Sequence, residues 1–473
     1  MAADITTLSG FQYRYTTTGF TGGVAGAVEF GSAWKNDAAA NALSAIDKFP
    51  SLSSYSGVNA VVSTRASNGA MKSILQKTTG TTLNNAGIGV VLIGSAACGT
   101  DGLRRQAIVT CGALTTGHAW YGMTANGLTK VSRYSNAGEV TGKRVPCGRT
   151  CLIWGVTGSA TYLKVLGTDA VVTGDIFGGE TPRSNAWLHI GCDADGASTT
   201  RWLGSYEQVA LFSTSDMSAL AASIEAYATE NLGITTPTKG HVICLGDSYG
   251  TGAYGWFADL SWPGQVAQAL PDWFVVNNCR GGYKIGDIYT NRATLIDAAA
   301  DRPLGATKPL LFIIDAGRND PLNNRTQSQM QTDMETLVSY LRTTYPTCGI
   351  VVCTNNPTGV ITGGGVVTNW SRLSGFNAWL TAGNLARYGV RVCDVAAIPQ
   401  FVPASGLSGD IDTVCTSSYY TIYDTTPSAT NDKTHLGPTG IELAKTVRQE
   451  SALDGAQDAL GSVPCRALAV GII

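Results

Sequence analysis

Four polar residues that could together carry out acyl transfer lie far apart in the second half of the chain. Ser248 stands in a Gly-Asp-Ser turn after the apolar run 241–245, Asn319 lies in an Arg-Asn-Asp-Pro segment, and Asp432 precedes His435 by three residues. A serine hydroxyl is a weak nucleophile unless a base within hydrogen-bond reach takes its proton. An imidazole can act as that base, and a carboxylate on its other nitrogen fixes the tautomer. These residues therefore predict a catalytic triad of serine, histidine and aspartate.

The choice of base follows from the scarcity of histidine. The chain has only 4 histidines, and two of them lie in its first half. His241 opens the run 241–245 and is expected at the end of that strand away from Ser248. His435 is therefore the histidine placed to act as base, with Asp432 as its partner. The alternative interpretation is that Asp432 is only an acid preceding a helix.

The elements that must position these residues follow the pattern of a parallel sheet with crossover helices. Apolar runs rich in Val and Ile, typical of strands covered on both faces, alternate with helical patterns. The carboxyl ends of parallel strands meet at one edge of a sheet, and ligands bind there. Ser248, the segments 278–282 and 315–320, and the Asp432–His435 turn are expected at this edge. The predicted strands are 241–245, 273–277, 309–314, 349–354 and 389–395, and the predicted helices are 259–270, 330–341, 372–387 and 438–450.

The order and placement of these four blocks resemble the SGNH (GDSL-like) serine hydrolases over residues 240–450. The resemblance implies a three-layer α/β domain. It also implies an oxyanion hole whose donors are the amides of Ser248 and Gly282 and the side chain of Asn319. Glycine is expected at 282 because a Cβ would crowd the tetrahedral centre. The neighbouring Gly281 is the alternative, and a simple turn asparagine is the alternative for Asn319.

Two long segments, 355–369 and 398–431, open on the same edge and are predicted to be loops that shape a substrate pocket. Arg318 precedes the oxyanion asparagine and either contacts an anionic group of the substrate or is a solvated surface residue. Tyr419 and Tyr420 in the second loop either stack on sugar rings or pack the loop. These three residues are the candidate substrate-binding residues.

The first half of the chain has a different pattern. Short β-prone runs between Gly, Ser, Thr and Asn turns predict an antiparallel sandwich, closed by an amphipathic helix at 216–232. Residues 187–233 resemble the end of laminin-G-like (concanavalin A-like) jelly rolls, which implies a carbohydrate-binding or purely structural domain. Small polar residues with a Pro and a Gly mark a linker. The predicted organisation is a sandwich at 1–234, a linker at 235–240, a hydrolase domain at 241–460 and a tail at 461–473.

The overall charge excludes several classes of function. The chain has 32 basic and 34 acidic residues, a net charge of −2, and no basic stripe for nucleic acid or an anionic membrane. No run approaches the length of a membrane span, and the first residues lack the pattern of a signal peptide. The 12 cysteines form no zinc-binding motif, and their spacing leaves open whether some form disulfides. We expect no metal and no cofactor.

These observations predict a serine esterase that removes acyl groups, O-acetyl above all, from a carbohydrate. A Gly-rich sandwich without an export signal fits a phage tail or fibre protein acting on host surface polysaccharide, virion-associated or extracellular. Its partners would be an acylated glycan, further copies of the chain and other virion proteins. A lipase or phospholipase of the same family is one alternative. A non-catalytic virion attachment or decoration protein that keeps the fold as a scaffold is another, although Ser248, Asp432, His435 and Asn319 together favour catalysis.

Overall fold

A computed structural model shows that the 473-residue chain divides into two compact units. The first consists of residues 1–238, 251–264 and 423–430, and the second of 239–250, 265–422 and 431–473. The structure describes residues 2–9, 11–20, 33–36, 43–45, 51–55, 58–62, 75–82, 87–95, 105–111, 120–125, 128–133, 139–157, 160–174, 185–190, 205–214, 216–251, 261–359, 364–417, 420, 433, 435–436 and 438–461.

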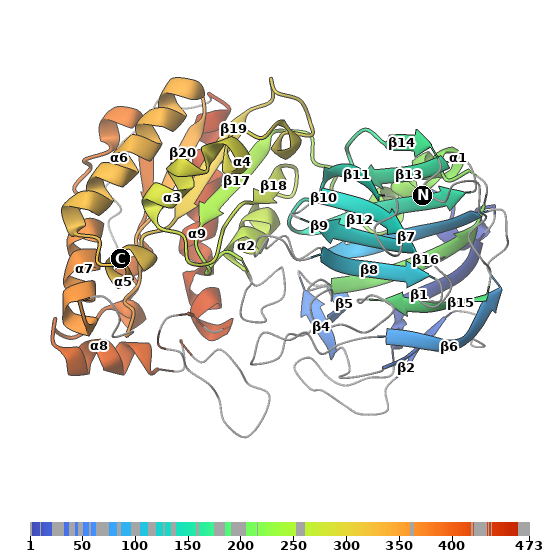
Figure 1. The fold of residues 1–473 in the computed structure, drawn as a ribbon, viewed down its shortest axis with the longest axis horizontal. Coiled ribbons are helices and arrows are strands. Elements are labelled where there is room, and N and C mark those ends of the chain that lie inside the picture. Colours follow the sequence, from blue (N-terminus) through green and yellow to red (C-terminus); the bar gives the residue numbers. More distant parts are fainter. Residues whose placement is uncertain are drawn as a thin grey trace. The chain divides into compact units, whose positions relative to one another are not determined.

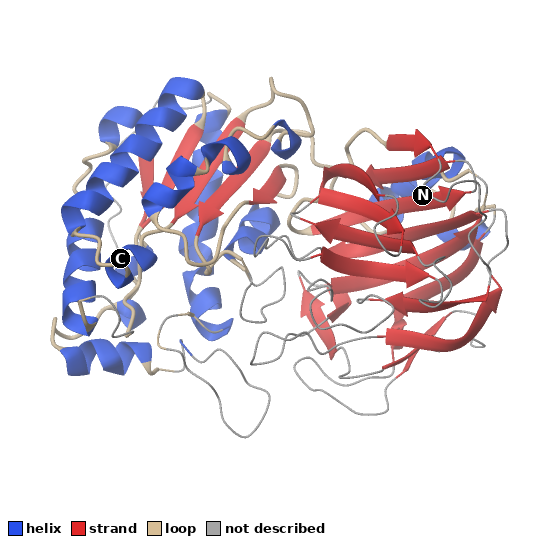
Figure 2. Ribbon diagram, viewed as in Figure 1, coloured by secondary structure: helices blue, strands red, loops and turns tan. Residues whose placement is uncertain are grey.

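The first unit is built from antiparallel strands (Figures 1 and 2). They are β1 (Phe11–Phe20), β2 (Ala33–Asn36), β3 (Leu43–Ala45), β4 (Ser51–Tyr55), β5 (Val58–Val62), β6 (Leu75–Thr82), β7 (Gly87–Ser95), β8 (Arg105–Cys111), β9 (Trp120–Ala125), β10 (Leu128–Arg133), β11 (Glu139–Arg144), β12 (Arg149–Thr157), β13 (Ala160–Val165), β14 (Val171–Gly174), β15 (Asn185–Ile190) and β16 (Ser205–Ser213). Their order is β11-β10-β9-β8-β15-β6-β3-β2-β1-β16-β7-β12-β13-β14, with β5 pairing both β4 and β16. The predicted antiparallel structure is confirmed in these residues, whereas the jelly-roll arrangement and the laminin-G-like resemblance stay predictions.

The helix expected at 216–232 is present and packs on this sheet. It consists of α1 (Ser218–Ala226) and a π-helical turn (Tyr227–Asn231). Met217, one residue before α1, lies over two strands where glycines leave room for its side chain. A Cβ at Gly89 would lie 2.1 Å from Met217 Sδ, and one at Gly155 would lie 2.5 Å from its Cγ. The helix therefore closes onto β7 and β12 because neither position carries a side chain.

The second unit contains a five-stranded parallel sheet with the order β18-β17-β19-β20-β21 (Figure 2). All five predicted strands are present, and the sheet fits the α/β fold that the resemblance implies. Nearly every strand residue is buried, as the unbroken apolar runs indicate. The strands are β17 (His241–Gly246), β18 (Phe274–Asn277), β19 (Leu310–Asp315), β20 (Gly349–Cys353) and β21 (Val390–Cys393).

Helices cover both faces of this sheet (Figure 1). On one face, apolar side chains of α3 (Ile285–Thr290), α4 (Arg292–Leu295), α6 (Gln327–Thr344) and α7 (Val366–Thr381) form one core with alternate strand residues such as Phe312. The apolar stripe expected along 330–341 is the face of α6 that packs in this core. A capping box of Thr326 and Gln329 begins the helix.

The other face is covered by α2 (Trp262–Ala269) and α9 (Pro438–Ala459). The two helices are joined because Gln265 Nε2 donates to the Ile441 carbonyl at 3.1 Å and Gln449 Nε2 to the Gln265 carbonyl at 2.9 Å. Within the described residues, no helix is both long and apolar enough to cross a bilayer.

Several predicted boundaries were wrong. The segment 398–431, predicted as one loop, contains a 3-10 turn (Pro399–Phe401) and α8 (Ser408–Cys415). The helix expected at 372–387 begins earlier and ends at Thr381, so that 366–369 is helix rather than loop. Short helices such as α3 and α5 (Asn319–Leu322) were not predicted, because four to six residues give too little periodicity to read.

Helix α9 approaches the sheet through a pair of glycines. A Cβ at Gly349 in β20 would lie 2.4 Å from the Gly455 carbonyl oxygen of α9. A Cβ at Gly455 would lie 2.7 Å from Val351 Cγ2 and 2.8 Å from Leu311 Cδ1. The backbone of α9 therefore rests on the sheet at a separation that no side chain at these positions would allow.

We expect Gly455→Ala to lower the free energy of unfolding by about 1–3 kcal/mol, because the methyl group overpacks this contact. The matched control is Gly409→Ala in α8, where an added Cβ meets nothing within 4 Å. That change should stabilise the protein by about 0.5–1 kcal/mol, since alanine is the better helix former. Urea unfolding of both variants measures the difference, and equal effects of the two substitutions would contradict the close approach.

Candidate active site

Ser248 lies in a tight turn at the carboxyl end of β17. The backbone of Gly250 donates to the Asp247 carbonyl at 3.1 Å, and the Tyr249 N–H donates to Asp247 Oδ1 at 3.0 Å. From β18, Asn277 Nδ2 donates to the Gly250 carbonyl at 2.6 Å. Gly246 is required by close approach, since a Cβ there would lie 2.5 Å from the Asp315 carbonyl oxygen of β19. These contacts present the serine at the edge where parallel sheets bind ligands.

The structure brings Ser248 and His435 together. Ser248 Oγ and His435 Nε2 are 2.7 Å apart, although 187 residues separate them in the chain. When the ring proton is on Nδ1, the hydroxyl donates to Nε2, which is the arrangement a general base requires. His435 is only 9% exposed, whereas Ser248 is half-buried.

The segment that carries His435 is fixed on both sides. The carbonyl of Lys433 accepts from the Gly359 N–H at 2.7 Å, and its ammonium pairs with Asp412 of α8 at 2.7 Å. Lys433 has φ 60°, a left-handed conformation that costs a non-glycine residue about 1–2 kcal/mol. After His435, Pro438 begins α9, and proline suits a first helical position because it has no N–H to satisfy. Asp432, the predicted acid of the triad, lies outside the described residues.

The predicted oxyanion donors come from two segments that are hydrogen-bonded to each other. Asn319 Nδ2 donates to the Tyr283 carbonyl at 3.0 Å, directly after Gly282. The next residue of α5, Asp320, accepts at Oδ2 from the Ile285 N–H at 3.1 Å. Two consecutive residues of α5 therefore clamp the backbone that follows Gly282.

The structure adds a backbone reason for glycine at 282, while crowding of the tetrahedral centre by a Cβ stays a prediction. An added Cβ would meet nothing within 4 Å, so crowding by protein atoms does not require glycine. The backbone does, because Gly282 has φ 77°, a conformation that other residues adopt only with strain. The same holds for Gly317 at φ 129°, in the turn before Asn319.

A cluster of buried charges lies beneath the serine turn. Asp315, the last residue of β19, accepts from Arg318 Nη1 at 2.6 Å and from Arg448 Nη2 of α9 at 2.9 Å. Arg318 Nη1 also lies 3.6 Å from Asp247 Oδ2. All four side chains are at most 3% exposed. Two carboxylates and two guanidinium groups neutralise one another in this cluster, which is the condition for burying charge.

The two carboxyls of the cluster have opposite pKa shifts. Burial raises the pKa of Asp315, but the charges of Arg318 and Arg448 together lower it by more. The pKa of Asp315 therefore lies below the ordinary value. For Asp247, burial outweighs the attraction of Arg318, and its pKa lies above the ordinary value. Asp315 is thus the firmly ionised anchor to which both arginines bind.

These contacts correct two predicted substrate residues. Arg318 is 1% exposed and its charge is bound by Asp315, so it is neither a substrate contact nor a solvated surface residue. Tyr420 is fully buried, with its hydroxyl donating to the Pro357 carbonyl at 2.8 Å and accepting from Asn356 Nδ2 at 2.8 Å. Tyr420 therefore packs its loop rather than stacking on a ligand. Tyr419 lies outside the described residues.

Three residues that connect to the serine and histidine were missed. Tyr249 contacts the His435 ring, Asn356 binds Tyr249 and Arg318, and Arg448 reaches Asp315 from α9. Arg448 lies within a helix whose pattern shows only that it packs on the sheet. The run of polar residues after the strand Gly349–Cys353 was the one available signal for Asn356.

Eight cysteines are buried and form no disulfide: Cys147, Cys151, Cys244, Cys279, Cys348, Cys353, Cys393 and Cys415. Among the described side chains, no group of three or more His, Cys, Asp or Glu could hold a metal ion.

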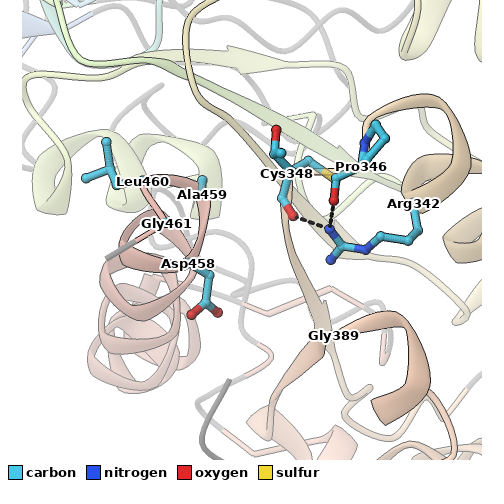
Figure 3. Close-up of a pocket in the computed structure, with 9 residues that line it drawn as sticks. Arg342, Pro346, Cys348, Gly389, Asp458, Ala459, Leu460 and Gly461 are labelled. Carbon is cyan, nitrogen blue, oxygen red and sulfur yellow. Dashed lines mark hydrogen bonds between the residues drawn. The ribbon is translucent and has the colours of Figure 1, made fainter. Parts of the chain in front are cut away.

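A pocket of about 430 Å³ lies at the opposite edge of the sheet, where β20 and β21 begin (Figure 3). Its polar groups are engaged by the protein. Arg342 donates to the carbonyls of Pro346, Cys348 and Tyr388 at 2.7–2.9 Å, and Asp458 pairs with Arg391. Figure 3 shows the Arg342 guanidinium directed at the first two of these carbonyls.

Comparison with known proteins supports the assignment of the second unit. Residues 244–440 match the model of the GDSL-like Lipase/Acylhydrolase family, so this stretch is a GDSL-like lipase/acylhydrolase domain. The matched stretch holds Ser248, Gly282, Asn319 and His435 in the order that the sequence resemblance describes. No curated protein matched the chain.

Solved structures of the same kind are similar to part of the chain. They include a lipolytic G-D-S-L family member from Veillonella parvula (13% identity, 45% of this chain and 96% of that one, TM-score 0.31). A mutant acetyl-xylooligosaccharide esterase from Geobacillus has 13% identity, and the match covers 46% of this chain and 95% of the esterase with a TM-score of 0.32. A psychrotrophic esterase from Pseudoalteromonas has 15% identity, and the match covers 46% of this chain and 98% of that esterase with a TM-score of 0.31. Likenesses this weak say nothing about the substrate of this chain.

We expect Arg448→Met to lower the free energy of unfolding by about 3–5 kcal/mol, because it leaves the buried Asp315 carboxylate with one partner instead of two. Lys445→Met in the same helix is the control. Lys445 pairs with Glu442, which is more than half exposed, and such pairs contribute less than about 1 kcal/mol. Urea unfolding at neutral pH compares the two, and similar small losses would show that the buried cluster does not stabilise the fold.

Burial raises the pKa of Asp320 to about 7, well above the unfolded value of about 3.9. The folded protein therefore binds more protons than the unfolded chain between these values, and stability falls as pH rises through this window. Asp320→Asn keeps an acceptor for the Ile285 N–H but cannot ionise, so it should remove this slope. We expect the variant to exceed the wild type in stability by about 1–3 kcal/mol at pH 8 and to match it near pH 4. Urea unfolding from pH 4 to 8 tests this, and parallel curves would contradict it.

Proposed function

We propose that the second unit is a serine hydrolase that cleaves acyl esters, with Ser248 as nucleophile and His435 as its base. The observation that carries the proposal is the 2.7 Å separation of Ser248 Oγ and His435 Nε2 at the carboxyl edge of the sheet. The match of residues 244–440 to an acylhydrolase family supports the same chemistry.

In the first step, Nε2 takes the hydroxyl proton as Ser248 Oγ bonds to the ester carbonyl carbon. The alcohol leaves with that proton, and an acyl-enzyme remains. Water then repeats the sequence: His435 takes its proton, the acid is released and the serine hydroxyl is restored. We assign Asp432 as the residue that orients the imidazole.

The negative charge that develops on the carbonyl oxygen needs preset donors. The amides of Ser248 and Gly282 and the side chain of Asn319 are our candidates. One hydrogen of the Asn319 amide is directed at the Tyr283 carbonyl. The second remains for the oxyanion, because an NH₂ group has two donors. The hydrogen bond to Tyr283 thus orients the Asn319 amide and leaves its second N–H able to donate to the oxyanion.

For the substrate, we propose an O-acylated carbohydrate, O-acetyl above all, on a host surface polysaccharide. Support comes from the Gly-rich antiparallel unit that precedes the hydrolase, whose last residues resemble carbohydrate-binding jelly rolls. A virion-associated or extracellular location, in a phage tail or fibre, fits this combination. A lipase or phospholipase activity and a non-catalytic scaffold are the competing outcomes of the test.

We expect Ser248→Ala in the full chain to reduce hydrolysis of p-nitrophenyl acetate by about 10⁴-fold or more, because no other group replaces the nucleophile. Ser374→Ala, at a half-buried serine on α7, should retain activity and control for the substitution. Thermal unfolding of both variants should match the wild type. Equal turnover by Ser248→Ala and the wild type would overturn the assignment.

The same samples distinguish the substrates. Acetate release from an O-acetylated polysaccharide, exceeding fatty-acid release from lipid micelles, is the expected result. Faster release of fatty acid would identify a lipase, and no turnover of any ester would indicate a scaffold.

A further inference from the structure

We propose that Tyr249 is a positioning residue for the catalytic base. This inference rests on the proposed function and adds a residue that neither the triad nor the oxyanion hole includes. The Tyr249 and His435 rings lie 5.4 Å apart between centroids with an interplanar angle of 33°. Separations of 4.5–7 Å with an offset are those at which aromatic rings attract each other. Tyr249 therefore holds the plane of the imidazole whose Nε2 meets Ser248 Oγ.

The tyrosine ring is itself fixed by a cation. The guanidinium carbon of Arg318 lies 3.7 Å from the centroid of the Tyr249 ring. Arg318 is itself fully buried and bound to Asp315. A desolvated cation over an aromatic face is held more strongly than one at the surface, where water screens the attraction. The ring thus has a rigid support within the buried charge cluster.

The backbone N–H and the side-chain hydroxyl of Tyr249 are also held by hydrogen bonds. Its N–H donates to Asp247 Oδ1, and its hydroxyl accepts from Asn356 Nδ2 at 3.0 Å. Asn356 in turn accepts at Oδ1 from Arg318 Nε at 3.1 Å. Arg318, Asn356 and Tyr249 therefore form a closed set of contacts, and few rotations of the ring remain open to it.

The consequence concerns turnover more than binding. A base in the wrong orientation slows proton transfer, and small displacements of reacting groups cost up to about 100-fold in rate. The ring lies against the imidazole and the guanidinium, and none of its contacts needs a substrate. Loss of the ring should therefore lower kcat and leave KM nearly unchanged, whereas loss of the hydroxyl alone should have little effect.

The test compares Tyr249→Leu, which removes the ring, with Tyr249→Phe, which keeps it. Both are made in the full chain and assayed with p-nitrophenyl acetate. We expect Leu to lower kcat by about 10- to 100-fold with KM within about twofold, and Phe to restore kcat to within about threefold of the wild type. Tyr388→Leu is the matched control. It also removes a tyrosine under an arginine, with Arg387 4.9 Å from its ring, but precedes β21 at the other edge of the sheet and should not change kcat.

The outcomes separate this inference from the proposed function. Wild-type kcat in Tyr249→Leu would overturn the positioning role, provided that Ser248→Ala is inactive. Activity in Ser248→Ala would overturn the proposed function instead. Where Tyr249→Leu fails to fold by circular dichroism, Tyr249→Met, whose flexible side chain fills the same space without a ring, replaces it. Failure of both to fold, or an equal loss of kcat in Phe and Leu, would show a structural role and also overturn the inference.

Discussion

The interaction on which the rest of this domain depends is the burial of Asp315 between Arg318 and Arg448. It joins three parts of the chain at one point: the end of β19, the turn before α5, and α9. Removing such charges from water costs several kcal/mol per ion, and the cost is offset only when partners and geometry are good. Because each of these parts also carries or adjoins an active-site segment, their mutual position is a condition for the site.

The consequence can be followed from α9 to the base. His435 lies three residues before Pro438, where α9 begins. The helix is placed by the glycine contact of Gly455 with the sheet and by the ion pair of Arg448 with Asp315. On the other side, Gly246 brings β17 against the Asp315 backbone, directly before the serine turn. The positions of Ser248 and His435, whose Oγ and Nε2 lie 2.7 Å apart, thus both depend on the same end of β19.

The sequence predicted the parallel sheet and the meeting of Ser248 with His435, because buried strands are long apolar runs and their carboxyl ends share an edge. It did not predict Arg318 as a buried residue. An arginine beside Asn319 has the same appearance in the sequence whether it faces solvent or a carboxylate 2.6 Å away. For the same reason the sequence left open whether Tyr420 stacks on a ligand or packs its loop, since hydrogen bonds to the Pro357 carbonyl and Asn356 decide its burial. Pairings of side chains across distant segments have no local signature, whereas periodicity does.

Part of the cost of this arrangement lies at the serine edge. Gly282, Gly317 and Lys433 have positive φ within the segments that carry the candidate oxyanion donors and the proposed base. Asp247 Oδ2 and Asp320 Oδ1 are buried without a hydrogen-bond partner among the described residues. Strained backbone and unsatisfied polar groups persist where the surrounding structure over-determines them, and functional sites are where they gather. A scaffold would be more stable with apolar residues in place of Asp247 and Asp320, so these two buried carboxyls favour a working site over a retained fold.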